Sequence, residues 1–216
     1  MSEVEPQRWL HNLKGRFLVF EGPDGSGKST QYARIVEDCR AAGLTVCEVR
    51  EPGGTAISEK IRDLLLDTKS PDMSIRCEMM LYMASRAQLV DERIRPALER
   101  GEVVIADRFV TSTIAYQGHA GGVPVQDILA VARAACRDVW PDLIVVFDVD
   151  EATAQSRMDR ERDRIEQRGA AYREKVREGY RAQVREEPAR HVLLDARGSV
   201  DEVNQAMRDA IQARFA

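Results

Sequence analysis

The sequence has few cysteines and histidines and no long apolar run. Its 216 residues include 4 Cys and 3 His, and no two cysteines form a C-x-x-C pair, so a cysteine-rich metal site is not indicated. Thiols spaced in this way are most often buried side chains in a reducing compartment. No apolar run approaches the roughly 18 residues of a membrane helix, and residues 1–15 are too polar for a signal peptide. We therefore expect a cytoplasmic protein without a membrane partner.

A strong excess of either charge is also missing. The chain carries 32 basic and 36 acidic residues, a net charge of −4, and a pI near 5.6. It therefore lacks the overall basic field that draws proteins onto nucleic acid, and we expect no nucleic-acid partner. The charge is uneven, however: residues 156–190 contain 11 Arg or Lys and 8 Asp or Glu.

The apolar pattern predicts an α/β fold. Short β-rich runs alternate with longer segments of helical periodicity, which favours a five-stranded parallel sheet with helices on both faces. The predicted strands are residues 16–21, 44–49, 103–106, 143–147 and 191–194. A mass of 24.3 kDa allows one domain, predicted over residues 16–216, with a helical lid at about 151–170.

Three smaller features refine this prediction. Residues 1–15 form an N-terminal extension, which could pack on the domain through Trp9 and Leu10 or remain an unordered leader. Pro96 should end or kink the long helix that begins near Ile75. Residues 199–202, SVDE, form a capping box before the last helix.

Residues 22–29, GPDGSGKS, fit the P-loop pattern G-x-x-x-x-G-K-[ST] between a predicted strand and a predicted helix. Such a loop cradles phosphates with backbone N–H groups, while Lys28 reaches the β- and γ-phosphates and the Ser29 hydroxyl can bind Mg²⁺. The alternative is an ordinary glycine-rich turn. The predicted ATP-binding residues are Gly22, Asp24, Gly25, Ser26, Gly27, Lys28, Ser29 and Thr30.

An acidic residue ends the third predicted strand. Asp107 would lie at the carboxyl edge of the sheet, where ligands bind in open α/β folds, and could orient the water shell of Mg²⁺. The alternative is a structural carboxylate paired with Arg108. Ser29, Asp107 and Asp24 are the candidate magnesium ligands.

Three further motifs indicate which molecule accepts the phosphate. They are residues 50–55, REPGGT; residues 82–86, YMASR; and residues 107–118, DRFVTSTIAYQG. Together with the P-loop they resemble the thymidylate kinase family, which uses ATP to convert dTMP to dTDP. The ordered match runs from about Phe17 to Ala213 and includes DRIE at residues 163–166. The resemblance implies a P-loop NTPase fold, ATP and Mg²⁺ as cofactors, and a homodimer.

Tyr82 and Arg86 stand at positions i and i+4, on one face of a predicted helix. A pyrimidine needs a stacking surface and a donor for a carbonyl oxygen, and these residues offer both. The family places an aromatic ring on the thymine and the arginine on its O4. Because cytosine carries an amino donor there, an arginine should reject it.

The resemblance implies roles for the rest of the acceptor site. Arg108 would bind the acceptor phosphate, and Tyr116 would pack under the sugar and crowd a 2′-hydroxyl. Asp24 would accept the 3′-hydroxyl, and the Glu51–Pro52 pair would shape the wall through a cis peptide or an ordinary turn. The predicted substrate-binding residues are Asp24, Arg50, Glu51, Pro52, Tyr82, Arg86, Arg108, Ser112, Thr113, Tyr116 and Gln117.

Transfer to a nucleotide phosphate needs little proton chemistry, because the acceptor is largely dianionic at pH 7. We therefore expect charge neutralisation rather than a general base to dominate. Members of the family place a catalytic arginine either in the P-loop or in the lid. Gly25 follows Asp24 here, which resembles the bacterial lid-arginine type. The lid candidates are Arg157, Arg160, Arg162 and Arg164, and the predicted catalytic residues are Lys28, Arg108, Arg160 and Arg157.

Two alternatives remain from the sequence. One is a kinase for another deoxynucleotide or a deoxynucleoside, and the latter would need a carboxylate base near the 5′-hydroxyl. The other is a P-loop protein that binds ATP to regulate an assembly without catalysis.

Overall fold

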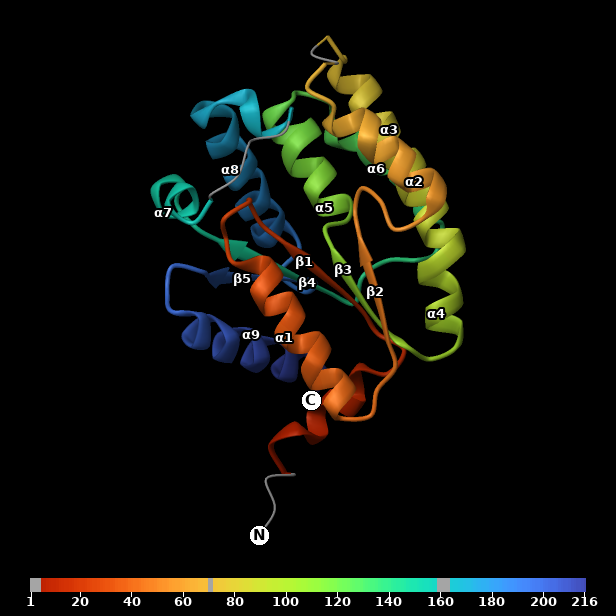
Figure 1. Ribbon diagram of the computed structural model, residues 1–216, viewed down its shortest axis with the longest axis vertical. Helices are drawn as coiled ribbons and strands as arrows, with labels where there is room; N and C mark the ends of the chain where they lie inside the picture. The colour runs from red at the N-terminus through yellow and green to blue at the C-terminus, as the bar shows by residue number, and fades with distance from the viewer. Residues whose placement is uncertain (1–4, 70–71, 159–163) are drawn as a thin grey trace.

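A computed structural model describes residues 5–69, 72–158 and 164–216 of the chain, and a parallel sheet forms its centre (Figure 1). The strand order is β2-β3-β1-β4-β5, with parallel pairing throughout. The strands are β1 Phe17–Glu21, β2 Val46–Arg50, β3 Val103–Asp107, β4 Leu143–Asp148 and β5 His191–Asp195. All five predicted strands are confirmed, as is the α/β class.

Successive side chains of each strand point to opposite faces of the sheet, and both sets are largely apolar. Helices therefore cover both faces. Leu18 and Phe20 pack toward one layer, formed by α1 (Lys28–Ala41), α9 (Val200–Phe215) and the 3-10 helix η1 (Glu5–Leu13). Phe17 and Val19 pack toward the other, which contains α3 (Ile75–Leu89), α6 (Val125–Cys136) and α8 (Ala170–Glu186). Figure 1 shows α1 and α9 side by side below the sheet.

The helix that begins at Ile75 changes type shortly before Pro96. α3 ends at Leu89, and a π-helical turn then leads into a short helix that has Pro96 in its first turn. Proline lacks the N–H that a continuous helix would need at this point. The remaining elements are α2 Ala56–Leu66, η2 Val90–Ile94, α4 Arg95–Glu99, α5 Val110–Thr113, η3 Ile114–Ala120, α7 Glu151–Ser156 and η4 Glu166–Arg168.

The first and last described helices, η1 and α9, belong to the same layer. Leu10 is fully buried there and Trp9 nearly so. The Asn12 side chain donates to the Phe215 carbonyl at 2.7 Å. The described part of residues 1–15 therefore packs on the domain. At the start of α9, Ser199 and Glu202 form the predicted capping box.

This strand order brings the carboxyl ends of three strands together, where a ligand site can form. β1 lies between β3 and β4, so the carboxyl ends of these three strands meet at one edge, where open α/β folds bind ligands. In the described part of the chain, no helix is long and apolar enough to cross a membrane.

Asp148, at the end of β4, ties the sheet to α8. Arg177 and Arg181 each donate to its carboxylate at 2.7 Å. Burial opposes ionisation here, but these hydrogen bonds outweigh it and lower the pKa of Asp148. Because the folded-state pKa is lowered, the stabilisation is present above the unfolded pKa and is lost as pH falls through the folded one.

We expect Asp148→Asn to reduce the free energy of unfolding at pH 7 by about 1–3 kcal/mol, the usual range for hydrogen bonds to a charged group. The loss should shrink as pH falls through the folded-state pKa of Asp148. Urea unfolding of both proteins at several pH values measures it. Asp201→Asn, which removes an exposed ion pair with Arg34, is the control and should have little effect. An equal loss in the control would contradict the assignment.

Candidate active site

The loop after β1 adopts a conformation that requires glycine. Gly22 and Gly25 have φ values of 140° and 78°, in the region that other residues avoid. A Cβ on Gly25 would also lie 2.2 Å from the carbonyl oxygen of Ala154. The loop ends at Gly27, the N-cap of α1, so the positive end of the α1 dipole faces the space that the loop encloses.

A cavity of about 580 Å³ lies against this loop. Its wall includes all the predicted ATP-binding residues except Gly22. The opposite wall comes from the chain after β5 and the start of α9, through Ala196, Gly198, Ser199, Val200 and Val203. Sequence reasoning missed this wall, although its place just after a strand is a signal for ligand contact.

Lys28 lies at the base of the loop and is only 6% exposed. Its ammonium group pairs with the Asp107 carboxylate. Burial and the nearby charge of Arg108 outweigh that carboxylate and lower the pKa of Lys28. A cation held out of water in this way gains strongly from a phosphate ligand.

Arg108 has an unusual backbone conformation, with a φ of 72°. For a residue other than glycine this is strained, and surrounding contacts must hold it. Its guanidinium donates to Asp24 at 3.1 Å and to the Tyr180 hydroxyl at 2.9 Å, and it lies 5.4 Å from the centre of the Tyr116 ring. These contacts fix the guanidinium beside the P-loop.

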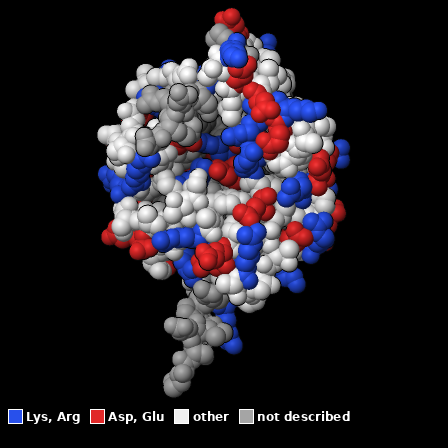
Figure 2. All heavy atoms as spheres, in the orientation of Figure 1, with Lys and Arg blue, Asp and Glu red and all other residues white. Residues whose placement is uncertain are grey.

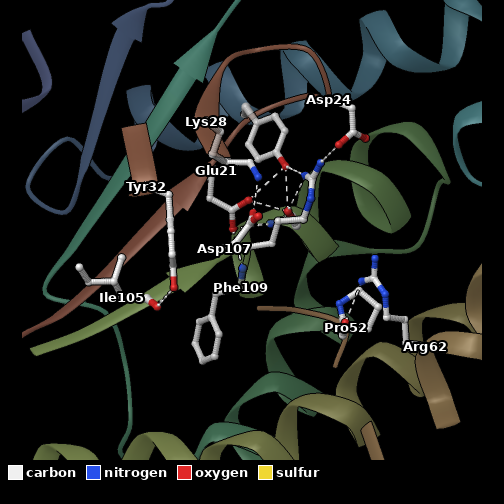
Figure 3. Close-up of polar contacts among 12 residues, drawn as sticks. Glu21, Asp24, Lys28, Tyr32, Pro52, Arg62, Ile105, Asp107 and Phe109 are labelled. Carbon is white, nitrogen blue, oxygen red and sulfur yellow. Dashed lines mark hydrogen bonds and ion pairs between the residues drawn. The ribbon is translucent and has the colours of Figure 1, made fainter. Parts of the chain in front are cut away.

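Glu21, the last residue of β1, anchors the segment that carries Arg108. Its carboxylate accepts the backbone N–H of Phe109 at 2.8 Å and that of Ser112 at 3.1 Å. It also accepts the Ser112 and Tyr180 hydroxyls at 2.5 and 3.1 Å. Burial raises the pKa of Glu21, opposed by Arg108. Figure 3 shows Glu21, Lys28 and Asp107 close together, with Asp24 at the far end of the network.

A second cavity, of about 240 Å³, lies beside the first. Nine of the predicted acceptor residues line it: Asp24, Glu51, Pro52, Tyr82, Arg108, Ser112, Thr113, Tyr116 and Gln117. The Glu51–Pro52 peptide is cis, one of the two predicted forms. Asp24 lines both cavities, so they meet at the P-loop.

Two predicted acceptor residues lie outside this lining. Arg50 pairs with Glu59 at 2.9 Å on the outer side of the loop. Arg86 is 1% exposed and its guanidinium donates to Glu51 at 2.7 Å, to the Met83 sulfur and to Thr113 at 3.1 Å. It therefore supports the pocket wall from behind, and its contact with a base stays a prediction.

The arginines of the predicted lid divide into three groups. Arg157 lines the P-loop cavity and donates to the carbonyls of Ala196 at 2.8 Å and Arg197 at 3.3 Å. Arg164 is buried and points away from that cavity, toward Leu65 and Glu78. Arg160 and Arg162 lie outside the described residues.

Three lining residues of the acceptor cavity were missed from the sequence: Arg62, Leu66 and Ile165. Arg62 and Leu66 stand at i and i+4 on α2, so their spacing was the available signal. Arg62 donates to the Pro52 carbonyl at 2.9 Å, which attaches α2 to the loop after β2 (Figure 3). Ile165 precedes η4 and belongs to the DRIE motif at residues 163–166.

Figure 2 shows that this face of the molecule is hollowed near its centre, with basic and acidic side chains at the hollow. Two adjoining cavities share an acidic P-loop residue, with Lys28 on the wall of one and Arg108 on the wall of the other. A P-loop fold with this arrangement defines a phosphotransferase of the nucleotide kinase class.

Comparison with known proteins gives the family. Residues 20–207 match the family model for thymidylate kinase. Similar proteins include thymidylate kinases from Exiguobacterium sp., 42% identical over 91% of this chain and 94% of the relative, and from Pseudomonas fluorescens, 43% identical over 90% and 94%. The crystal structure of thymidylate kinase from Ehrlichia chaffeensis, 28% identical, covers 91% of this chain and 98% of its own, with a TM-score of 0.70. The chain belongs to the thymidylate kinase family.

We expect Gly25→Ala to weaken ATP binding at least tenfold, about 1.4 kcal/mol, because the new Cβ would collide with the Ala154 backbone. Gly43→Ala is the matched control, since its φ is 79° and nothing lies within 4 Å of a Cβ there. The control should lose about 1–2 kcal/mol of stability from backbone strain alone and keep its ATP affinity. Calorimetric titration with ATP measures both, and equal affinities would contradict the assignment.

Proposed function

We propose that this chain transfers the γ-phosphoryl group of ATP to dTMP and releases dTDP and ADP. The observation that carries the proposal is the shared wall at Asp24, which joins a P-loop cavity to a pocket lined by Tyr82, Thr113 and Tyr116. A triphosphate in the first cavity and a nucleotide monophosphate in the second would bring their phosphates together at this wall.

Charge neutralisation is the main task of the residues at the junction. The acceptor phosphate is largely dianionic at pH 7 and is already a nucleophile, so no general base is needed. Lys28 would bind the donor phosphates and Arg108 the acceptor phosphate, which offsets the repulsion between the two groups. The buried Glu21 network holds Arg108 in place before any substrate arrives.

The junction also suits Mg²⁺, which prefers oxygen ligands and keeps several waters or phosphate oxygens. Ser29, Asp107 and Asp24 supply such oxygens, and no group of three or more His, Cys, Asp or Glu residues in the described parts of the chain forms an all-protein metal site. These three residues would hold the ion directly or through its water. When bound, Mg²⁺ neutralises charge on the phosphates.

Tyr82 would stack on the thymine, and Tyr116 would pack under the sugar. The Tyr116 ring is held by Arg108 and by neighbouring rings of Tyr172 and Tyr180, with centroids 6.5 and 6.3 Å away. A ring fixed on three sides leaves little room for a 2′-hydroxyl and would favour deoxyribose. Asp24 would accept the 3′-hydroxyl.

We also propose a homodimer and a cytoplasmic location. Met80 is 48% exposed on α3, beside a shallow apolar surface where α3 meets the start of α6. A large exposed apolar side chain at such a place fits a helical interface. All four cysteines are free, in keeping with a reducing compartment.

The direct test supplies the purified chain with ATP, Mg²⁺ and a panel of dTMP, dUMP, dCMP and thymidine, and identifies the products. Rapid dTDP formation is the expected result. Preferential phosphorylation of thymidine would instead favour a nucleoside kinase, and tight ATP binding without transfer to any acceptor would favour a regulator.

We expect Lys28→Ala to reduce kcat by roughly 10²–10³-fold, the usual cost of removing one preorganised charge contact. Affinity for dTMP should stay within about threefold, because the acceptor cavity does not include Lys28. Steady-state kinetics and dTMP calorimetry measure these effects. The exposed Lys60→Ala variant is the control and should match the wild type. Loss of both ligands in Lys28→Ala would count against the assignment.

We expect Tyr116→Ala to raise relative activity on the ribose analogue of dTMP about tenfold, by opening space at the 2′ position. Tyr116→Phe keeps the ring and should keep the discrimination. Comparing kcat/KM for the two nucleotides in each variant checks this expectation. Unchanged discrimination in Tyr116→Ala would remove Tyr116 from the sugar site.

A further inference from the structure

Glu78 of α3 is a completely buried carboxylate that receives donors from two other parts of the chain. Arg164 and Arg168 each donate to its Oε2 at 2.6 Å. The Gln117 amide nitrogen donates to its Oε1 at 2.8 Å. Arg164, Arg168 and Gln117 all donate hydrogen bonds at this position. A carboxylate suits it, because both of its oxygens accept.

This contact fixes the orientation of the Gln117 amide. A carboxylate can only accept, so the amide must turn its nitrogen toward Glu78 and its carbonyl oxygen the other way. Gln117 is 1% exposed and lines the acceptor cavity. Its carbonyl oxygen is therefore the atom of the amide that a base in this cavity would meet.

The same carboxylate holds a second part of the cavity wall. Arg164 also donates to the Leu65 carbonyl of α2 at 2.9 Å, and Arg168 donates to the Tyr172 hydroxyl at 2.7 Å. Between these arginines, Ile165 lines the acceptor cavity and is buried. Glu78 thus fixes both a polar and an apolar element of one wall.

We propose that Glu78 is a positioning residue for base selection, which acts by presenting the Gln117 carbonyl oxygen to the base. Thymine carries an N–H on its ring between two carbonyls, and this oxygen can accept it. Cytosine has a lone pair at the same ring position, so it would meet an acceptor with an acceptor. The inference rests on the proposed dTMP kinase activity. It adds Gln117 and Glu78 to the base selection that is predicted for Arg86.

The test replaces Glu78 with an isosteric amide. In Glu78→Gln, the new amide can donate to Gln117, so the Gln117 amide is free to turn its nitrogen toward the base. We expect the ratio of kcat/KM for dTMP to that for dCMP to fall at least about tenfold, through a higher KM for dTMP. The KM for ATP should not change, because Glu78 does not line the P-loop cavity.

The double variant Glu78→Gln with Gln117→Glu provides a rescue. The amide now sits at position 78 and donates to a carboxylate at position 117, which has only acceptors to offer the base. Selectivity for dTMP should return toward the wild-type ratio. Glu178→Gln, which removes the exposed pair with Arg185, is the control and should leave the ratio and both KM values unchanged.

If a variant turns over too slowly, calorimetry measures its affinity for dTMP and for dCMP instead. Thermal unfolding of the wild type and each variant measures stability. A lower melting temperature in Glu78→Gln with an unchanged preference for dTMP would mean a purely structural role and overturn the proposal. So would failure of the double variant to regain selectivity. Absence of dTDP formation by the wild type would instead overturn the proposed activity, so the two failures are distinguishable.

Discussion

The site depends on the buried carboxylate of Glu21 at the end of β1. It accepts the backbone N–H groups of Phe109 and Ser112 and thereby holds the chain that leaves β3 in a fixed position. Arg108 immediately precedes this segment and has a strained backbone with a φ of 72°. An unpaired buried carboxylate costs several kcal/mol, so the chain must supply these donors, and in doing so it supports the strain. The guanidinium that faces the acceptor cavity is therefore placed by folding itself.

The strand order places both cavities next to the segment that Glu21 holds. With β1 between β3 and β4, the P-loop, the segment after β3 and the start of α7 all meet at one edge of the sheet. The P-loop then forms a wall common to both cavities, through Asp24. Tyr180 connects α8 to the same centre, since its hydroxyl contacts both Glu21 and Arg108. α8 thus supports Arg108 at the acceptor cavity and also packs in the core.

Features with a local physical cause were predictable from the sequence. The five strands follow from apolar runs, and the start of the last helix follows from the Ser199 capping box. The P-loop residues and most acceptor residues also lie where their motifs indicated. Side-chain direction was less accessible: Tyr82 and Arg86 share a helical spacing, but Arg86 turns inward to pair with Glu51, because a buried carboxylate competes for it. The roles of Glu78 and Ile165 depend on contacts between distant segments, which no local pattern records.

We expect the two cavities that meet at Asp24 to act as one continuous site for two nucleotides. A bisubstrate analogue with thymidine and adenosine joined through their 5′ positions by a polyphosphate chain tests it most directly by calorimetry. We expect one analogue to bind per chain, with an affinity well above that of ATP or dTMP alone and with competition against both, because linking the halves makes the second binding event intramolecular. Binding that competes with only one of the two nucleotides, or that is no tighter than ATP, would contradict it.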